Sequence, residues 1–181
     1  MNNKKEQFNI LLVEDNDDHA EIIEFYIKEY SDNTTVHRID DGEKAIEYIK
    51  RQAAATERSY RSDEQTENSS QKDKLLQCNS IKEFEKGNNS HPHLIILDLK
   101  LPKYDGHEVL QEIKKSRNFK KIPVVIFTTS NSSLDIGKAL YHSANSYILK
   151  PIEQNKFKEV LGMIIAYWKM NERVRKKKIE P

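Results

Sequence analysis

The stretch FNILLVEDNDD, residues 8–18, changes its hydrophobic period half-way and so decides the fold. Its first six residues are an apolar run that is too short for a buried helix and typical of a strand covered on both faces. From Asp17 onward, apolar residues recur at helical spacing, and two aspartates stand where a helix dipole favours negative charge. We therefore predict a buried strand, an acidic turn and an amphipathic helix in immediate succession.

The same strand-then-helix unit recurs four more times along the chain. The predicted strands are Phe8–Val13, Thr34–Ile39, His93–Leu97, Ile122–Phe127 and Ser146–Leu149. The helix after the second strand is expected to end near Arg51, and the last helix to continue into the basic C-terminal residues. Strands that alternate with helices imply right-handed crossovers. The predicted fold class is α/β, with a doubly wound, five-stranded parallel sheet and helices on both faces.

A polar segment at residues 52–90 interrupts this alternation. It is rich in Ser, Gln, Asn and charged residues, and its few apolar residues cannot bury enough area to offset the entropy of ordering. We expect a mobile insertion with one short helix near residues 73–85. The predicted organisation is an N-terminal tail over 1–7, one domain over 8–173 that carries the insertion, and a basic tail over 174–181.

Composition excludes several classes of protein. The chain has 181 residues, a formal net charge of +1 and one cysteine, Cys78, so neither a disulfide framework nor a multi-cysteine zinc site can form within it. No apolar run approaches 18 residues, and the first residues lack a signal-peptide pattern, so we expect a cytoplasmic protein without membrane contact. The near-zero net charge argues against nucleic-acid binding, although the stretch from Arg173 to Lys178 is basic.

Chemically active side chains stand at the carboxyl ends of the predicted strands, where sheets of this class form their sites. They are Glu14 and Asp15 after the first strand, Asp98 after the third, Thr128 after the fourth and Lys150 after the fifth. Three converging carboxylates repel one another unless their pKa values rise or a hard divalent cation neutralises them, which favours Mg²⁺. A lysine and a threonine then suit the oxygens of a phosphoryl group.

Four motifs extend this interpretation. They are ILLVEDN at 10–16, LIILDLKLPKYDG at 94–106, PVVIFTTS at 123–130 and YILKP at 147–151. In these motifs and in their order, the chain resembles the response-regulator receiver domains of two-component signalling. The resemblance implies a flavodoxin-like strand order, 2-1-3-4-5.

The resemblance also implies roles for the acidic residues. Asp98 would accept a phosphoryl group from a phosphohistidine of a sensor histidine kinase. Mg²⁺ would be held by Asp98, by Asp15 directly, by Glu14 directly or through water, and by the backbone carbonyl of Lys100. An amide or small side chain is more usual at the position of Lys100, so the lifetime of the phosphoryl group is expected to differ here.

Further roles are implied for residues of the fourth and fifth strands. Thr128 and Lys150 would bind phosphoryl oxygens, and Tyr147 would be the aromatic switch whose rotamer follows Thr128. The Lys150–Pro151 peptide bond would be cis, which proline tolerates because its trans preference is only about 0.5 to 1 kcal/mol.

Within the family, the chain most resembles the small single-domain regulators paired with phytochrome kinases. This similarity rests on the motifs DLxLPxxDG and FTTS, on the pair Tyr167–Trp168 and on the absence of an output domain. The expected partner is a sensor histidine kinase, with a phytochrome as a candidate. Phosphorylation is expected to shift a self-association equilibrium, with a symmetric homodimer as the first choice and a separate effector protein as the alternative.

Two other functions use similar residues. A Mg²⁺-dependent phosphatase with an aspartyl-phosphate intermediate is the alternative, but such enzymes place a second aspartate two residues after the nucleophile, where this chain has Lys100. An FMN binder would meet repulsion between its phosphate and the carboxylates of Glu14, Asp15 and Asp17. We interpret the chain as a phosphorylation-dependent binding module, not an enzyme, with slow self-dephosphorylation.

Overall fold

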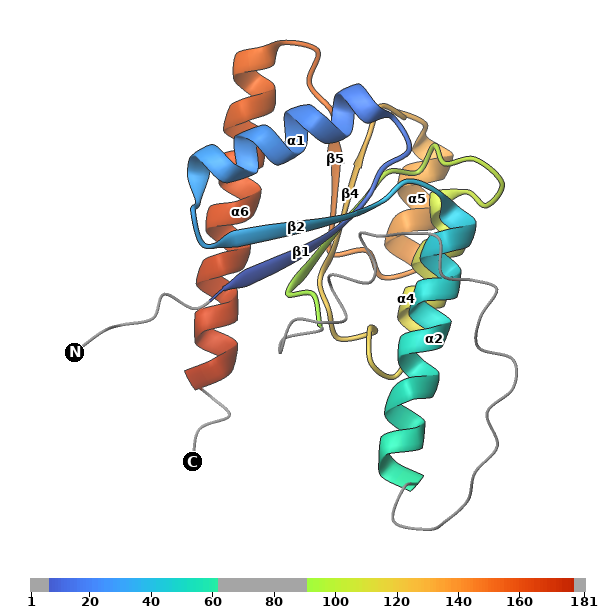
Figure 1. The fold of residues 1–181 in the computed structure, drawn as a ribbon. Helices are drawn as coiled ribbons and strands as arrows, with labels where there is room; N and C mark the ends of the chain where they lie inside the picture. Colours follow the sequence, from blue (N-terminus) through green and yellow to red (C-terminus); the bar gives the residue numbers. More distant parts are fainter. Residues whose placement is uncertain (1–6, 62–90, 178–181) are drawn as a thin grey trace, which may run out of the picture.

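The computed structural model describes residues 7–61 and 91–177, in which strands and helices alternate (Figure 1). The strands are β1 (Phe8–Val13), β2 (Thr34–Ile39), β3 (Leu94–Leu97), β4 (Val124–Thr128) and β5 (Ser146–Leu149). The helices are α1 (Asp17–Tyr30), α2 (Gly42–Arg61), α4 (Gly106–Lys115), α5 (Ser133–Tyr141) and α6 (Gln154–Lys177).

All strand pairs are parallel, and the sheet has the order β2-β1-β3-β4-β5. The predicted fold class and strand order are confirmed. The register brings the carboxyl ends of neighbouring strands level, since Val13 pairs with Leu97 and Thr128 pairs with Leu149. The residues that follow these pairs therefore meet at one edge of the sheet.

Each face of the sheet carries its own hydrophobic core, because successive side chains of a strand point to opposite faces. In β1, Leu11 and Val13 pack into the core beneath α2, α4 and α5, whereas Ile10 and Leu12 pack into the core beneath α1 and α6. Figure 1 shows these two helical layers on either side of the sheet. The strands are thus held from both sides, which gives the loops at their carboxyl ends a rigid base.

Helix α2 is longer than predicted. It continues to Arg61, so the expected end near Arg51 is wrong, and the first part of the predicted insertion belongs to this helix. The reason is that three consecutive alanines at 53–55 have high helix propensity without adding to the apolar periodicity. The rest of the predicted insertion, residues 62–90, lies outside the described residues, with its expected short helix.

Helix α6 runs to Lys177 and so includes the first half of the predicted basic tail, residues 174–177. Phe157, Leu161 and Ile164 are buried, and Trp168 packs partly buried against the same core. Its neighbour Tyr167 is 54% exposed. Among the helices in the described parts of the chain, none has the length and apolar character to span a membrane.

Candidate functional site

The carboxyl edge of the sheet gathers four of the predicted site residues. Glu14 directly follows β1, Asp98 follows β3, Thr128 ends β4 and Lys150 follows β5. All four are buried, with exposed fractions between 0% and 8%. Buried polar groups at one edge must be paired with one another or with a ligand.

Lys150 joins the two buried carboxylates. Its Nζ lies 2.6 Å from Glu14 Oε2 and 2.5 Å from Asp98 Oδ2. The backbone fixes where this side chain starts, since the Lys150 amide donates to the Thr128 carbonyl at 2.8 Å. One ammonium between two carboxylates neutralises only one of their two charges, so the site keeps a net negative charge when both are ionised.

Burial is the largest influence on Glu14 and raises its pKa above the ordinary value of 4.5. The nearby ammonium of Lys150 acts in the opposite direction without cancelling this effect, and the Asp98 carboxylate adds to the rise. The positive charge near the ionised Glu14 carboxylate therefore does not fully compensate for its burial. A further cation near Glu14 would relieve this deficit.

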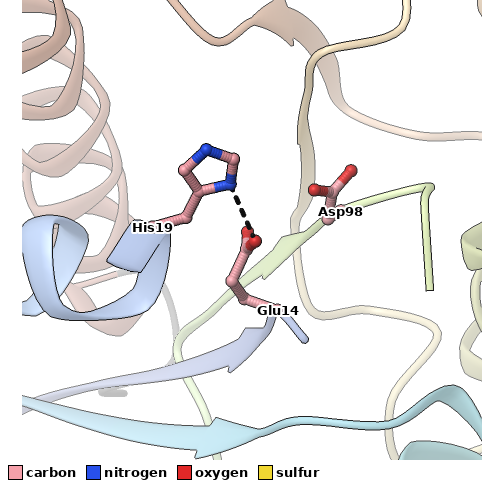
Figure 2. Close-up of side chains that lie close together, drawn as sticks. All are labelled: Glu14, His19 and Asp98. Carbon is pink, nitrogen blue, oxygen red and sulfur yellow. Dashed lines mark hydrogen bonds and ion pairs between the residues drawn. The ribbon is translucent and has the colours of Figure 1, made fainter. Parts of the chain in front are cut away.

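His19 is a member of the cluster that our reading of the sequence missed. Its Nδ1 lies 3.2 Å from Glu14 Oε1 and 3.2 Å from Lys150 Nζ. Figure 2 shows the imidazole of His19 facing the Glu14 carboxylate, with Asp98 on the neighbouring strand end. One ligand atom from each of Glu14, His19 and Asp98 lies within 4.8 Å of the other two.

The local sequence explains how His19 reaches the site. Asn16 caps helix α1 and accepts a hydrogen bond from the His19 backbone amide at 2.9 Å, which places His19 in the first turn above the end of β1. The available signal was this position, five residues after Glu14 and three after the capping residue Asn16. Strand ends alone do not indicate His19, because it lies on a helix.

Asp15 and Lys100 are placed differently from the other predicted ligands. The side chain of Asp15 is exposed and is not part of the cluster of Glu14, His19 and Asp98. Lys100 has an exposed side chain, and its backbone amide donates to Asp98 Oδ1 at 3.1 Å. The two oxygens of Asp98 are thus held by different partners, Oδ1 by an amide and Oδ2 by an ammonium.

Arg38 of β2 braces the loop that carries the acidic pair. Its guanidinium donates to the carbonyls of Glu14 and Asp15, each at 3.0 Å, and pairs with Asp17 at 2.7 Å. This interaction across neighbouring strands orients the backbone of the β1–α1 loop. Nothing in the sequence around Arg38 indicates it.

The loop after Asp98 is fixed by a close approach of two backbones. A Cβ on Gly106 would lie 2.3 Å from the carbonyl oxygen of Asp98, so a side chain cannot be accommodated there without a shift. The Gly106 amide also donates to the Leu99 carbonyl at 2.9 Å, and Asp105 caps helix α4 in a capping box with Glu108. Helix α4 therefore begins directly against the strand end that presents Asp98.

Thr128 and Tyr147 meet through the loop that joins β4 to α5. Thr128 Oγ1 accepts from the Ser130 amide at 3.3 Å, and the Tyr147 hydroxyl donates to the Ser130 carbonyl at 2.9 Å. The Tyr147 ring packs against the core on the α4 and α5 side. Burial raises the pKa of this phenol.

One detail near this loop corrects a prediction from the sequence. The Lys150–Pro151 bond is trans, so the expected cis bond is wrong; the trans isomer is also the one that X–Pro bonds favour. Ser132 precedes helix α5 as its cap but makes no side-chain capping bond. The Ser130 hydroxyl donates to Asp135 Oδ2 at 2.6 Å.

Comparison with known proteins identifies the family. The family model described as "Response regulator receiver domain" matches residues 68–162. The chain is also 32% identical over 164 residues to the "Probable methanogenesis regulatory protein FilR2" of Methanothrix harundinacea, which covers 91% of this chain and 85% of that protein. The chain belongs to the response-regulator receiver family.

This receiver domain is also similar to regulators associated with phytochromes. It is 44% identical to Response regulator Rcp1 of Synechocystis over 82 residues, which span 45% of this chain and 55% of Rcp1. The crystal structure of the phosphorylated cyanobacterial phytochrome response regulator RcpA has a TM-score of 0.67 and 30% identity, and covers 90% of this chain and 94% of that one. The structure of Mn²⁺-bound Rcp1 has a TM-score of 0.65 and 28% identity, and the match covers 89% of this chain and 94% of that one. The predicted family is confirmed, and so is the predicted similarity to phytochrome-associated regulators.

Proposed function

We propose that this receiver domain accepts a phosphoryl group on Asp98 from a phosphohistidine of a sensor histidine kinase. The observation that carries the proposal is the buried Asp98 carboxylate, held at the carboxyl edge of the sheet with Lys150 Nζ 2.5 Å from it. In the transfer, an Asp98 oxygen attacks phosphorus and the bond from phosphorus to the kinase imidazole breaks. The electron pair stays on the imidazole nitrogen, which takes up a proton.

The residues at this edge fit a divalent cation. Glu14 and Asp98 share a single ammonium, and the raised pKa of Glu14 indicates that its ionised form needs more positive charge. Mg²⁺ accepts carboxylate oxygens and keeps several waters, so these two carboxylates suffice to hold it, with Asp15 and the Lys100 carbonyl as further ligands. A bound ion would neutralise charge on the phosphoryl oxygens during transfer. Among structural neighbours, Rcp1 is known in a Mn²⁺-bound form.

Lys150 and Thr128 act on the phosphoryl group once it is on Asp98. The ammonium that now contacts Asp98 Oδ2 would pair with a phosphoryl oxygen, and the Thr128 hydroxyl would donate to another. Because the Thr128 hydroxyl and Tyr147 both bind Ser130, a shift of this threonine changes the support of the tyrosine ring. The signal is then a population shift between two packings of the loop and of β5.

The same geometry weakens the phosphatase alternative. The residue two positions after Asp98 is Lys100, whose exposed side chain has no carboxyl group to act as general acid and base. Hydrolysis of the phosphoaspartate would rely on water alone, which makes self-dephosphorylation slow. The domain is therefore a signalling module whose phosphorylated surface is recognised by another molecule.

The proposed partners follow from the relatives. RcpA is described as a cyanobacterial phytochrome response regulator, so a sensor histidine kinase of the phytochrome class is our proposed phosphodonor. A second copy of the chain is the proposed partner of the phosphorylated surface. Large apolar side chains exposed on α5 and in the loop after β5 support this choice; they are Leu134, Leu140, Tyr141 and Ile152.

Intact-protein mass spectrometry with a small phosphodonor such as acetyl phosphate tests the proposal. The wild type should gain one phosphoryl group with Mg²⁺ and none with EDTA, and Asp98→Asn should gain none under either condition. Asp32→Asn is the matched control, because Asp32 is an exposed aspartate at the opposite edge of the sheet. Equal incorporation by Asp98→Asn and the wild type would refute the assignment.

A further inference from the structure

We infer that His19 is a ligand of the cation at this site and gives the site a preference for first-row transition cations, such as Co²⁺, Ni²⁺ and Zn²⁺, over Mg²⁺. The inference rests on the proposed function, because the ion concerned is the one that would assist transfer to Asp98. It goes further in assigning a nitrogen ligand and, with it, a different class of cation.

The first support is that one positive charge already lies where the three side chains meet. Lys150 Nζ contacts Glu14 Oε2 at 2.6 Å, Asp98 Oδ2 at 2.5 Å and His19 Nδ1 at 3.2 Å. The two carboxylates and the imidazole therefore converge on a cation rather than merely lying near one another. Figure 2 shows that these side chains come from α1 and from the ends of β1 and β3.

The second support is the combination of burial and access. Glu14 and Asp98 are buried and held in place, whereas the His19 side chain is 36% exposed and forms the outer wall of the cluster. A hydrated ion can thus approach past the imidazole and exchange waters for protein ligands. The cap at Asn16 fixes the backbone of His19, so little ordering is required for the ring to bind.

The third support is the chemistry of the ligands. Mg²⁺ prefers oxygen ligands in an octahedral arrangement and gives up its waters reluctantly. Imidazole nitrogen suits Co²⁺, Ni²⁺ and Zn²⁺, and the affinity of mixed nitrogen and oxygen sites rises along the first transition row to copper. Beside the carboxylates of Glu14 and Asp98, His19 therefore offers these ions a nitrogen ligand that Mg²⁺, with its preference for oxygen, does not favour.

Lys150 competes with this ion for the same three atoms. A cation bound by Glu14, His19 and Asp98 must displace the ammonium from between the carboxylates. Replacing Lys150 with Met would remove the competitor and raise the affinity for Co²⁺, and this gain should depend on His19. A purely structural His19, which only holds Glu14 or Lys150 in place, would influence all divalent cations alike.

Isothermal titration of the full chain with Co²⁺ and with Mg²⁺, in a Cys78→Ser background, separates these cases. We expect His19→Gln to weaken Co²⁺ binding at least about tenfold, since even the indirect supports of metal ligands contribute that much, while Mg²⁺ binding changes by less than about twofold. The visible spectrum of bound Co²⁺ should also change, because it reports the loss of a nitrogen ligand. His142→Gln, at the opposite edge of the sheet, should alter neither.

The outcomes distinguish this inference from the proposed function. Equal weakening of Co²⁺ and Mg²⁺ binding, or an unchanged Co²⁺ affinity and spectrum in both His19→Gln and His19→Ala, would overturn the role of His19 while leaving Asp98 as phosphoacceptor intact. Failure of the wild type to bind either ion would overturn both the cation site and the inference. A far-ultraviolet circular dichroism spectrum like that of the wild type verifies that each variant is folded.

Discussion

The Tyr147 hydroxyl donates to the carbonyl oxygen of Ser130 at 2.9 Å, and this bond ties β5 to the loop that follows Thr128. The same serine uses its hydroxyl to bind Asp135, which in turn lies 3.4 Å from His107 Nε2. The loop beside the site is thus connected to α4, α5 and β5 at once. A displacement of Thr128 would therefore alter the packing of all three elements, which form much of the surface on that side of the sheet.

The first prediction concerns self-association. Beryllofluoride, which stands in for the phosphoryl group, should shift the wild type toward a dimer in analytical ultracentrifugation, since the changed Tyr147 packing alters the surface near α5 and α6. Tyr147→Ala should lose this response, and Tyr167→Ala, which removes an exposed ring of α6, should weaken the dimer itself. An unchanged sedimentation coefficient of the wild type would rule out the dimer switch. A full response in Tyr147→Ala would rule out the aromatic relay alone.

The second prediction concerns the pH dependence of the Asp135 interaction. The hydrogen bond from the Ser130 hydroxyl is the main cause that lowers the pKa of Asp135 below 3.8; burial opposes it and His107 adds to the lowering. A carboxylate with a lowered pKa stabilises the folded state above its ordinary pKa, and this contribution is lost as the pH falls through the lowered value. Ser130→Ala should therefore raise the pKa of Asp135.

The Asp135 pKa in Ser130→Ala would be measured by carboxyl-carbon NMR titration, and stability by urea unfolding, both between about pH 3 and pH 7. This range brackets the ordinary pKa of an aspartate, about 4. The difference in unfolding free energy between Ser130→Ala and the wild type should be constant near neutral pH and shrink below pH 4. Ser132→Ala is the matched control, because Ser132 makes no side-chain capping bond. An Asp135 pKa that stays the same in Ser130→Ala would contradict the assignment.

The third prediction compares two glycines. Gly106→Ala places a methyl group 2.3 Å from the Asp98 carbonyl oxygen, so it should destabilise the fold by about 1 to 3 kcal/mol, as overpacking does, and displace the Asp98 strand end. A Cβ at Gly137, within helix α5, would meet nothing within 4 Å, so Gly137→Ala should stabilise by about 0.5 to 1 kcal/mol. Urea unfolding measures both. Similar values for the two variants would show that the approach at Gly106 is not tight.

The fourth prediction concerns the charge balance at the site. Lys150→Met leaves two buried carboxylates without their shared partner, so the unfolding free energy should fall by about 3 to 5 kcal/mol in the presence of a chelator. Adding Mg²⁺ should restore part of this loss, because the ion replaces the missing charge. Lys138→Met, at an exposed lysine of α5, should have little effect. No loss in Lys150→Met would mean that the carboxylates are not both ionised in the wild type.

Much of the fold could be predicted because its strands are short apolar runs that end in polar residues. The run at Phe8–Val13 and the one at Leu94–Leu97 are unambiguous, and parallel pairing then brings Glu14 and Asp98 to the same edge. Helix ends were harder, since α2 continues through alanines that carry propensity but no periodic signal. Local rules for strand pairing and burial thus predict the sheet, but they do not predict where every helix ends.

The site was predictable only where strand ends define it. His19 lies on a helix, and its approach to Glu14 depends on the cap at Asn16 and on the phase of the first turn. Arg38 reaches the same loop from a neighbouring strand, a contact that no local pattern shows. Such contacts depend on packed side-chain positions, which the sequence pattern does not determine.

The most direct test of the central claim is to locate the phosphoryl group chemically. The full chain would be phosphorylated with Mg²⁺ and acetyl phosphate and then treated with borohydride, which reduces an aspartyl phosphate to homoserine. Peptide mass spectrometry would then read the modified position. Homoserine at position 98 alone is the predicted result; homoserine at Asp15, Asp105 or another acidic residue, with Asp98 unmodified, would contradict the account.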